Sequence, residues 1–207
     1  GDYLLTLIND ILDLSKIEAG KIELNPNDFN FNQFIQGITE LFQMRTQQKG
    51  IIFIYEPLSP LPIGIYADEK RLRQILINLL GNAVKFTAQN GEVRLTVKVI
   101  NKIMATQEDN SKNEHLPINQ IRFQVKDTGF GIAPEDLDKI FLPFQQVGDK
   151  KHQAQGTGLG LPITKQLIEM MGGELHVDSQ LGQGSVFSMT LDLPEVLSME
   201  TSSPSTH

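Results

Sequence analysis

The chain of 207 residues contains no cysteine, which excludes disulfide bonds and thiolate metal sites and is compatible with a reducing cytoplasm. It also has no apolar run close to the roughly 20 residues that are needed to span a bilayer. Its first residues are not typical of a signal peptide, because Asp2, Asn9 and Asp10 interrupt the apolar positions. The sequence therefore predicts a soluble protein that makes no membrane contact of its own.

Basic residues are also scarce, because 18 Lys and Arg stand against 25 Asp and Glu and leave a net charge of −7. Broad nucleic-acid binding needs a basic face, so we expect no nucleic-acid partner. A small nucleotide is compatible with this charge, because a few local donors and one divalent cation can neutralise its phosphates.

The length fits one substantial domain with a small appendage. The turn-forming run Asn25–Asp28 marks a boundary. We expect residues 1–24 to be the end of a bundle helix with its linker, residues 25–195 to be the main domain, and residues 196–207 to be a disordered tail.

The first 19 residues predict a helix that ends at Gly20, a residue suited to a C-cap. One apolar seam has heptad spacing and a second face is also apolar; the seam is Leu4, Leu7, Ile11 and Leu14, and the second face is Leu5, Ile8 and Leu12. Two apolar faces favour a helix of a bundle. The alternative is a helix that packs on its own domain.

Periodicity and turn residues predict a mixture of helices and hairpin strands in the rest of the chain. The expected helices are 32–48, 69–84, 134–140 and 158–171, and the expected strands are 29–31, 51–55, 92–100, 120–127, 174–179 and 184–193. Residues 56–65 are expected to be irregular, and 101–119 to be a long surface loop. The pattern predicts an α/β (α+β) two-layer sandwich, with one layer of helices on one mixed sheet.

Three polar residues share one face of the helix predicted over 69–84 and its continuation. Asn78 and Asn82 lie four residues apart, and Lys85 follows on the same side. An amide oxygen is a neutral, hard ligand for Mg²⁺, and an ammonium group can meet a phosphate. The alternative is a polar outer face, but Asn disfavours a helix interior, so two on one face need a reason.

Asp127 ends a predicted strand and is followed by Gly129 and Gly131. An ionised carboxylate only accepts hydrogen bonds, so it can read the amino group of adenine and repel the carbonyl of guanine. The glycines would let the backbone approach a flat base closely. An ordinary Asp-Thr-Gly turn is the alternative.

A second glycine run, Gly156-Thr157-Gly158-Leu159-Gly160, precedes a predicted helix, and exposed N–H groups at a helix start bind phosphate. Its spacing differs from the dinucleotide-binding Gly-x-Gly-x-x-Gly pattern, and the chain lacks the P-loop pattern. A glycine loop without a ligand is the alternative.

Two aromatic residues, Phe141 and Phe144, precede a polar stretch over 145–155 that we expect to be a mobile lid. They would anchor the near end of that lid, although two core aromatics are an equally compatible interpretation. Lys150, Lys151 and His152 lie in the lid and are candidates to reach a terminal phosphate; a solvated basic loop is the alternative.

These motifs, in this order, resemble the N box, first glycine box, F box and second glycine box of sensor histidine kinases, in the GHKL ATPase and kinase superfamily. They are Asn78–Thr87, Asp127–Ile132, Phe141–Phe144 and Gly156–Leu161. The stretch Leu12–Gly20 resembles the end of the second dimerisation helix of the hybrid type. The resemblance covers residues 1–195 and implies a Bergerat-type ATP-binding fold.

The resemblance also implies roles for individual residues. Asn82 would ligate Mg²⁺ with Asn78 in support, Lys85 would meet phosphate, and Asp127 would read adenine. The remaining residues implied to contact ATP are Gly129, Gly131, Ile132, Phe144, Gly156, Thr157, Gly158, Leu159 and Gly160.

Two departures from the family pattern matter. The phosphate-accepting His is absent, so the chain resembles a fragment that cannot phosphorylate itself at the usual site. The lid has Lys-Lys-His-Gln where many relatives are rich in Arg.

The resemblance also implies partners and a location. The implied partners are ATP, a His-containing dimerisation domain and a response-regulator receiver domain. The implied location is cytoplasmic, with membrane attachment possible only through a longer protein.

Asn78 also separates reaction types within the superfamily. ATP-hydrolysing members place a Glu four residues before the metal Asn to activate water, and Asn cannot act as that base. The sequence therefore favours transfer of the γ-phosphoryl group to a protein histidine over hydrolysis. A nucleotide-sensing or docking module without transfer activity is the alternative.

Overall fold

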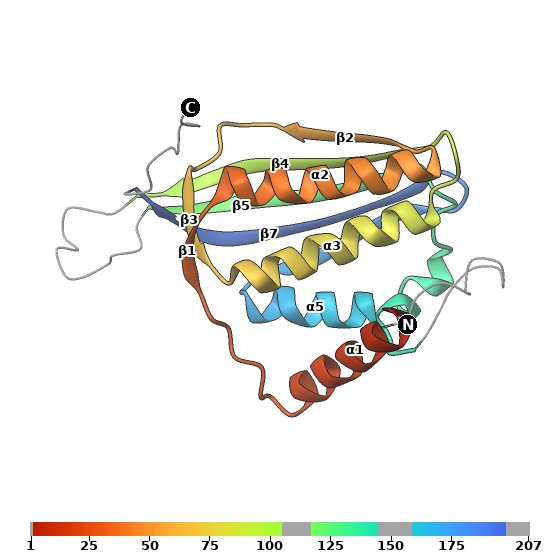
Figure 1. Cartoon of the computed structure of the whole chain (residues 1–207), viewed down its shortest axis with the longest axis horizontal. Coiled ribbons are helices and arrows are strands. Elements are labelled where there is room, and N and C mark those ends of the chain that lie inside the picture. The colour runs from red at the N-terminus through yellow and green to blue at the C-terminus, as the bar shows by residue number, and fades with distance from the viewer. Residues whose placement is uncertain (1, 105–116, 145–158, 198–207) are drawn as a thin grey trace.

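The computed structural model describes residues 2–104, 117–144 and 159–197. Seven strands in these residues form one mixed sheet with the order β1-β3-β7-β5-β4-β2, and β6 pairs with the other end of β7 (Figure 1). The strands are β1 Asn27–Asn30, β2 Ile52–Pro57, β3 Gly64–Ala67, β4 Glu92–Ile103, β5 Ile118–Asp127, β6 Glu174–Gln180 and β7 Gly184–Val196. Only the pairing of β2 with β4 is parallel among them.

Helices cover one face of this sheet, which confirms the predicted two-layer sandwich (Figure 1). They are α1 Asp2–Glu18, α2 Phe31–Lys49, α3 Glu69–Phe86 and α5 Gly160–Met170, with the short 3₁₀ turns η1 Pro134–Asp136 and η2 Lys139–Phe141. The helices α2, α3 and α5 lie side by side, and α1 lies against the outer side of α5.

The core lies between the helices and the sheet, where the predicted apolar patterns are buried. The apolar stripe of α3 is at most 1% exposed and consists of Leu72, Ile75, Leu76, Leu79 and Leu80. The inward-facing side chains of β4 and β5 are equally buried; they are Val93, Leu95 and Val97 on β4, and Ile121, Phe123 and Val125 on β5. Period-two alternation in a strand and a one-sided stripe in a helix are what this layering requires.

Helix boundaries follow the capping residues. The carboxylate of Asp68 accepts a hydrogen bond from the backbone N–H of Arg71 at 3.1 Å, so α3 begins just after it. Gly50 ends α2 with φ of 73°, a left-handed conformation that glycine adopts without a steric penalty. Asn30 caps α2, and this places Phe31 in the first turn of the helix instead of the strand predicted over 29–31.

Three further predictions about local structure are corrected. Residues 64 and 65, the end of the stretch expected to be irregular, belong to the short strand β3, which pairs with β1 on one side and β7 on the other. The helix predicted over 134–140 is two 3₁₀ turns, η1 and η2. The surface loop is shorter than 101–119, because β4 and β5 continue into it at both ends. Residues 105–116 of that loop lie outside the described residues, as do the predicted lid and the tail from 198.

The N-terminal helix packs on its own domain with one face and leaves the other exposed. Leu7, Leu14 and Ile17 are partly buried against the core, so this face agrees with the alternative of a helix that packs on its own domain. The predicted heptad seam is split between the two faces: Leu7 and Leu14 are partly buried, whereas Leu4 is 58% exposed and Ile11 is 41% exposed.

A polar cluster fixes the approach of α1 and its linker to the start of α3. Asp13 accepts a hydrogen bond from Gln74 at 3.1 Å, and its other oxygen lies 3.6 Å from the guanidinium of Arg71. Asp68 uses its second oxygen to accept from the backbone N–H of Asn25 at 2.8 Å. One carboxylate thus caps α3 and holds the linker.

We predict that Asp68→Ala lowers the free energy of unfolding by about 1–2 kcal/mol, because the helix cap and the linker contact are both lost. Urea denaturation measures this change. The matched control is Asp28→Ala on β1, an exposed position for which we expect a change of less than about 0.5 kcal/mol. Equal losses in the two variants would contradict the capping role.

Candidate nucleotide-binding site

The C-terminal half of α3 positions the three predicted polar residues. Its apolar stripe faces the core, so Asn78, Asn82 and Lys85 lie half-buried at the margin of the helix. The Nδ2 of Asn78 donates a hydrogen bond to the Oγ1 of Thr164 at 3.1 Å, and Thr164 is fully buried on α5. This bond joins the helix of the first motif to the helix that follows the second glycine run.

Lys85 lies where its charge is partly removed from water. Burial lowers the pKa of its ammonium group below the ordinary value. The Nζ lies 5.1 Å from the centroid of the Phe86 ring, a contact that favours the charged form. An ammonium group that is partly removed from water is stabilised by an anionic partner, because the anion replaces the lost hydration.

Asp127 lies at the end of β5 and is 4% exposed. Its Oδ1 accepts a hydrogen bond from the backbone N–H of Gly129 at 2.8 Å. Burial raises the pKa of this carboxyl, and hydrogen bonds from the backbone of Gly129 and Ser185 act in the opposite direction. The carboxylate is thereby held in one orientation and keeps lone pairs with which it can accept a further hydrogen bond.

The loop after Asp127 has no room for side chains at its glycines. A Cβ at Gly129 would lie 2.4 Å from the carbonyl oxygen of Phe86, at the end of α3. A Cβ at Gly131, where φ is 73°, would lie 2.1 Å from the carbonyl oxygen of Gln180. The rings of Phe86 and Phe130 also meet edge to face at 5.1 Å. The first glycine motif is therefore packed directly against the end of the helix that carries Asn82.

A serine pair supports this loop from the hairpin of β6 and β7, and sequence reasoning did not identify it. The Oγ of Ser179 accepts from the backbone N–H of Ile132 at 2.8 Å, donates to the carbonyl of Gly184 at 3.1 Å and lies 2.7 Å from the Oγ of Ser185. These serines lie about 50 residues beyond the motif and have no distinctive local pattern, so only the pairing of the strands reveals their role.

The second glycine motif is described only at its end. Leu159 is fully buried and Gly160 begins α5. Gly156, Thr157 and Gly158 lie outside the described residues, as do Lys150, Lys151 and His152 of the predicted lid. Figure 1 shows the start of α5 at the same end of the helical layer as the end of α3.

The two aromatics before the lid have different surroundings. Phe141 contributes to the core margin, where the Nζ of Lys165 lies 5.5 Å from its ring centroid. Phe144 is 59% exposed and has a φ of 64°, which is uncommon for a residue with a side chain. The ring of Phe144 is therefore not covered by the described residues, and it lies directly before the predicted lid.

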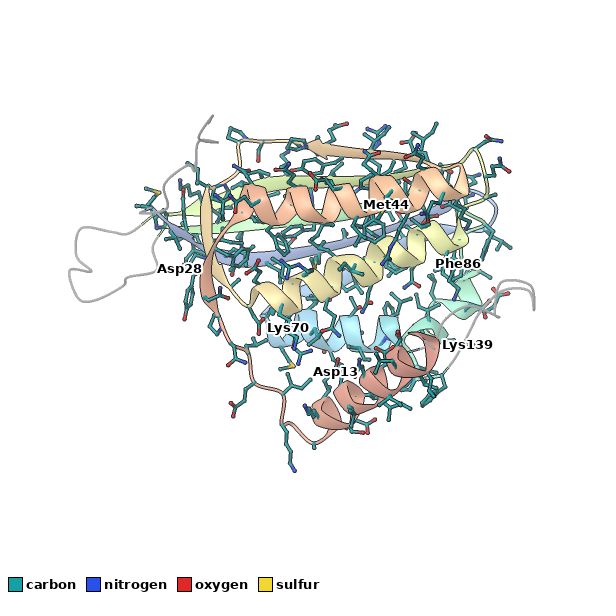
Figure 2. All side chains as sticks on the ribbon, in the orientation of Figure 1. Asp13, Asp28, Met44, Lys70, Phe86 and Lys139 are labelled. Carbon is teal, nitrogen blue, oxygen red and sulfur yellow. The ribbon has the colours of Figure 1, made fainter. Side chains whose placement is uncertain are left out.

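Lys85 and the Asp127 turn lie at the end of α3 where Figure 2 labels Phe86, and Asn82 and Asn78 lie earlier on the same helix. The set fits an adenine nucleotide with Mg²⁺, because it combines a buried acceptor, amide oxygens and a partly desolvated cation. A surface cavity of about 310 Å³ that Lys16, Lys21 and Arg71 help to line lies near the opposite end of α3 and is separate from this site.

The helical layer on a mixed sheet and the motifs at its edge define an ATP-binding sandwich of the histidine kinase and gyrase class. A sequence profile described as "Histidine kinase-, DNA gyrase B-, and HSP90-like ATPase" matches residues 67–195. The chain belongs to this family.

Relatives and solved structures place the chain among the histidine kinases. The aerobic respiration control sensor protein ArcB of Escherichia coli (strain K12) is 38% identical over 192 residues, which are 92% of this chain and 22% of ArcB. Full-length ShkA in complex with AMPPNP is 37% identical with a TM-score of 0.73, over 95% of this chain and 37% of ShkA. ThkA in complex with the response regulator TrrA is 26% identical with a TM-score of 0.63, over 91% of this chain and 47% of that one.

The chain thus spans about a fifth of the length of ArcB. Within the part of the chain that the structure describes, no helix combines the length and the apolar character needed to cross a membrane.

We predict that Asp127→Asn weakens ATP binding by about tenfold or more, because the hydrogen bond that adenine would donate to this position loses its charged acceptor. The discrimination between ATP and GTP should shrink as well. Calorimetric titration with both nucleotides measures the effect, and Asp178→Asn, an exposed change on β6, is the matched control. Unchanged ATP affinity in Asp127→Asn would refute the assignment.

The same carboxyl predicts a pH dependence of binding. Because burial raises its pKa, Asp127 takes up a proton at a higher pH than an exposed Asp. ATP affinity should therefore fall as the pH decreases through this raised pKa, and Asp127→Asn should lose that part of the dependence. An identical pH profile in the two proteins would exclude Asp127 as the titrating group.

Proposed function

We propose that this chain is the ATP-binding catalytic module of a two-component sensor histidine kinase. It would transfer the γ-phosphoryl group of ATP to a histidine on a dimerisation domain outside this chain. The observation that supports the proposal is the close approach of the Asp127–Gly129 turn to the carbonyl of Phe86, at the end of the helix that carries Asn82 and Lys85. The similarity to ArcB and to the ShkA complex with AMPPNP supports it.

Each residue has a separate task in this proposal. Asp127 accepts from the amino group of adenine, and Gly129 allows the base to approach the backbone. Asn82 supplies an amide oxygen to Mg²⁺, and Lys85 meets a phosphate. When bound, Mg²⁺ neutralises phosphate charge and favours the transfer. The bond between the γ-phosphorus and the oxygen of the leaving ADP breaks, a bond to the imidazole nitrogen forms, and the imidazole gives up a proton.

The environment of Asn78 supports transfer over hydrolysis. Its amide cannot deprotonate a water molecule, and its Nδ2 is engaged by the Oγ1 of Thr164 at 3.1 Å. The residue therefore acts as a link between α3 and α5 and as a support for Asn82. Hydrolysis without an acceptor would need a base that this position does not provide.

The proposed partners follow from the same reaction. A receiver domain would accept the phosphoryl group from the histidine, and the complex of ThkA with the response regulator TrrA supports a partner of this kind. ATP is cytoplasmic, so we propose that this module works in the cytoplasm. The glycines of the run over 156–160 would flank the phosphates.

We predict that Asn82→Ala abolishes the Mg²⁺-dependent part of ATP binding, because the amide oxygen is the proposed protein ligand of the ion. Calorimetric titration with ATP, with and without Mg²⁺, separates this part from the contribution of adenine. The matched control is Asn32→Ala, which makes the same change at an exposed position of α2 and should leave both titrations unchanged. A full Mg²⁺ effect in Asn82→Ala would exclude this residue as the ligand.

The transfer itself is tested with radiolabelled ATP and a separately expressed helical hairpin that carries an acceptor histidine. We expect label on the hairpin only when this chain is present, with the acid lability of a phosphohistidine. Binding of ATP without any labelled hairpin would favour a nucleotide-sensing or docking module. Release of phosphate without the hairpin at a comparable rate would indicate a hydrolysing ATPase.

A further inference from the structure

The face of the sheet that no described helix covers carries a block of basic side chains on its two long central strands. From Val93 to Val97 of β4 and along β5 every second residue is buried, and the residues between them lie on the opposite face. The described helices cover only one face of the sheet (Figure 1). Arg94 and Lys98 of β4, and Arg122 and Lys126 of β5, are therefore on the outer face.

The register of the two strands places these like charges opposite one another. Arg94 pairs with Lys126, and Lys98 pairs with Arg122, in the antiparallel ladder. Like charges directly opposite on neighbouring strands destabilise a sheet. Because the strands hold the centre of the sheet and their inward faces are apolar, the fold itself does not need basic residues at these outward positions.

Only one member of the block is neutralised by its described neighbours. The guanidinium of Arg94 lies 2.7 Å from Glu56 and 2.9 Å from Glu92. Lys98, Arg122 and Lys126 form no ion pair with any residue in the described ranges, although the chain as a whole carries a charge of −7. Three cations are thus kept together without counter-charges in an acidic protein.

The borders of the block limit what can bind there. Glu56 and Glu92 lie on one side of it. On the other side lie Asp192 of β7, opposite Gln120, and the outward-facing Glu174 and Asp178 of β6. A wide anionic surface, such as a bilayer or a duplex, would be repelled by these borders. A narrow acidic segment, no wider than a few strands of the sheet, would meet the cations and avoid the carboxylates.

Between the basic block and β6 the outer face carries small side chains, most of them polar. Thr96 is opposite Gln124 within the block, and Val186, Ser188 and Thr190 lie on the neighbouring β7. Short polar side chains leave a shallow, hydrogen-bonding floor beside longer cationic side chains. Such a floor can accommodate a backbone or a helix of a partner at close range.

We propose that the outer face of β4 and β5 docks an acidic segment of a partner protein, with Lys98, Arg122 and Lys126 meeting its carboxylates. The cost of opposing like charges in the free domain would then be offset when the partner supplies anions. This proposal does not depend on the nucleotide site, which lies on the helical side, at the end of β5 and of α3.

The test uses the full chain, labelled with ¹⁵N, and short poly-L-glutamate as the acidic probe. We expect saturable binding that weakens with added salt, with shifted amides along β4 and β5. Arg122→Glu should weaken binding by about tenfold, because an attraction becomes a repulsion. The same variant should raise the midpoint of thermal unfolding, because Lys98 gains an opposite charge across the ladder.

Two control variants make the result specific. Lys70→Glu makes the same charge change on the helical layer, at the exposed start of α3 that Figure 2 labels, and should leave the affinity for poly-L-glutamate nearly unchanged. Arg122→Gln removes the charge without reversing it and should give a smaller loss of affinity with the fold retained. Neither Arg122 variant should change ATP binding.

Four outcomes would overturn the proposal. They are absence of saturable binding, equal losses in Lys70→Glu and Arg122→Glu, a lower unfolding midpoint in Arg122→Glu, and tighter binding of duplex DNA or phosphatidylserine vesicles through the same residues. The last outcome would assign the face to a nucleic acid or a membrane instead of an acidic protein segment.

Discussion

The packing of α3 against the sheet, between α2 and α5, is the interaction on which the rest of the structure depends. Its apolar stripe is almost completely buried, and burial of each such side chain contributes roughly 1.5–3 kcal/mol. That stripe fixes the rotation of the helix about its axis. The rotation in turn places Asn78, Asn82 and Lys85 at the margin of the core, where they remain within reach of a ligand.

The same burial sets the chemistry of the site. Asp127 is removed from water, so its charge is costly unless a ligand or the backbone supplies hydrogen bonds. Lys85 is half-buried at the end of α3 and is likewise short of water. A site that holds one under-solvated anion and one under-solvated cation is suited to a ligand such as ATP, which has a donor at one end and phosphates at the other.

The N-terminal helix shows a different balance. Its docking uses a modest apolar contact together with the partly buried polar cluster of Asp13, Arg71 and Gln74. The exposed leucines and isoleucines on its far side remain apolar surface without a partner in the described chain. The helix is therefore held to the catalytic domain less firmly than the strands of the sheet are held to one another.

The sequence by itself determined the layers, most element boundaries and the motif residues, because periodicity, capping residues and glycines act through neighbours along the chain. It did not determine β3, whose four residues become a strand only between β1 and β7. Nor did it identify Thr164, Ser179 and Ser185, which support the site from distant elements. The division of α1 into a docked and an exposed face, and the opposition of Lys98 and Arg122, were also decided by tertiary structure, because packing partners and strand register exist only in the folded chain.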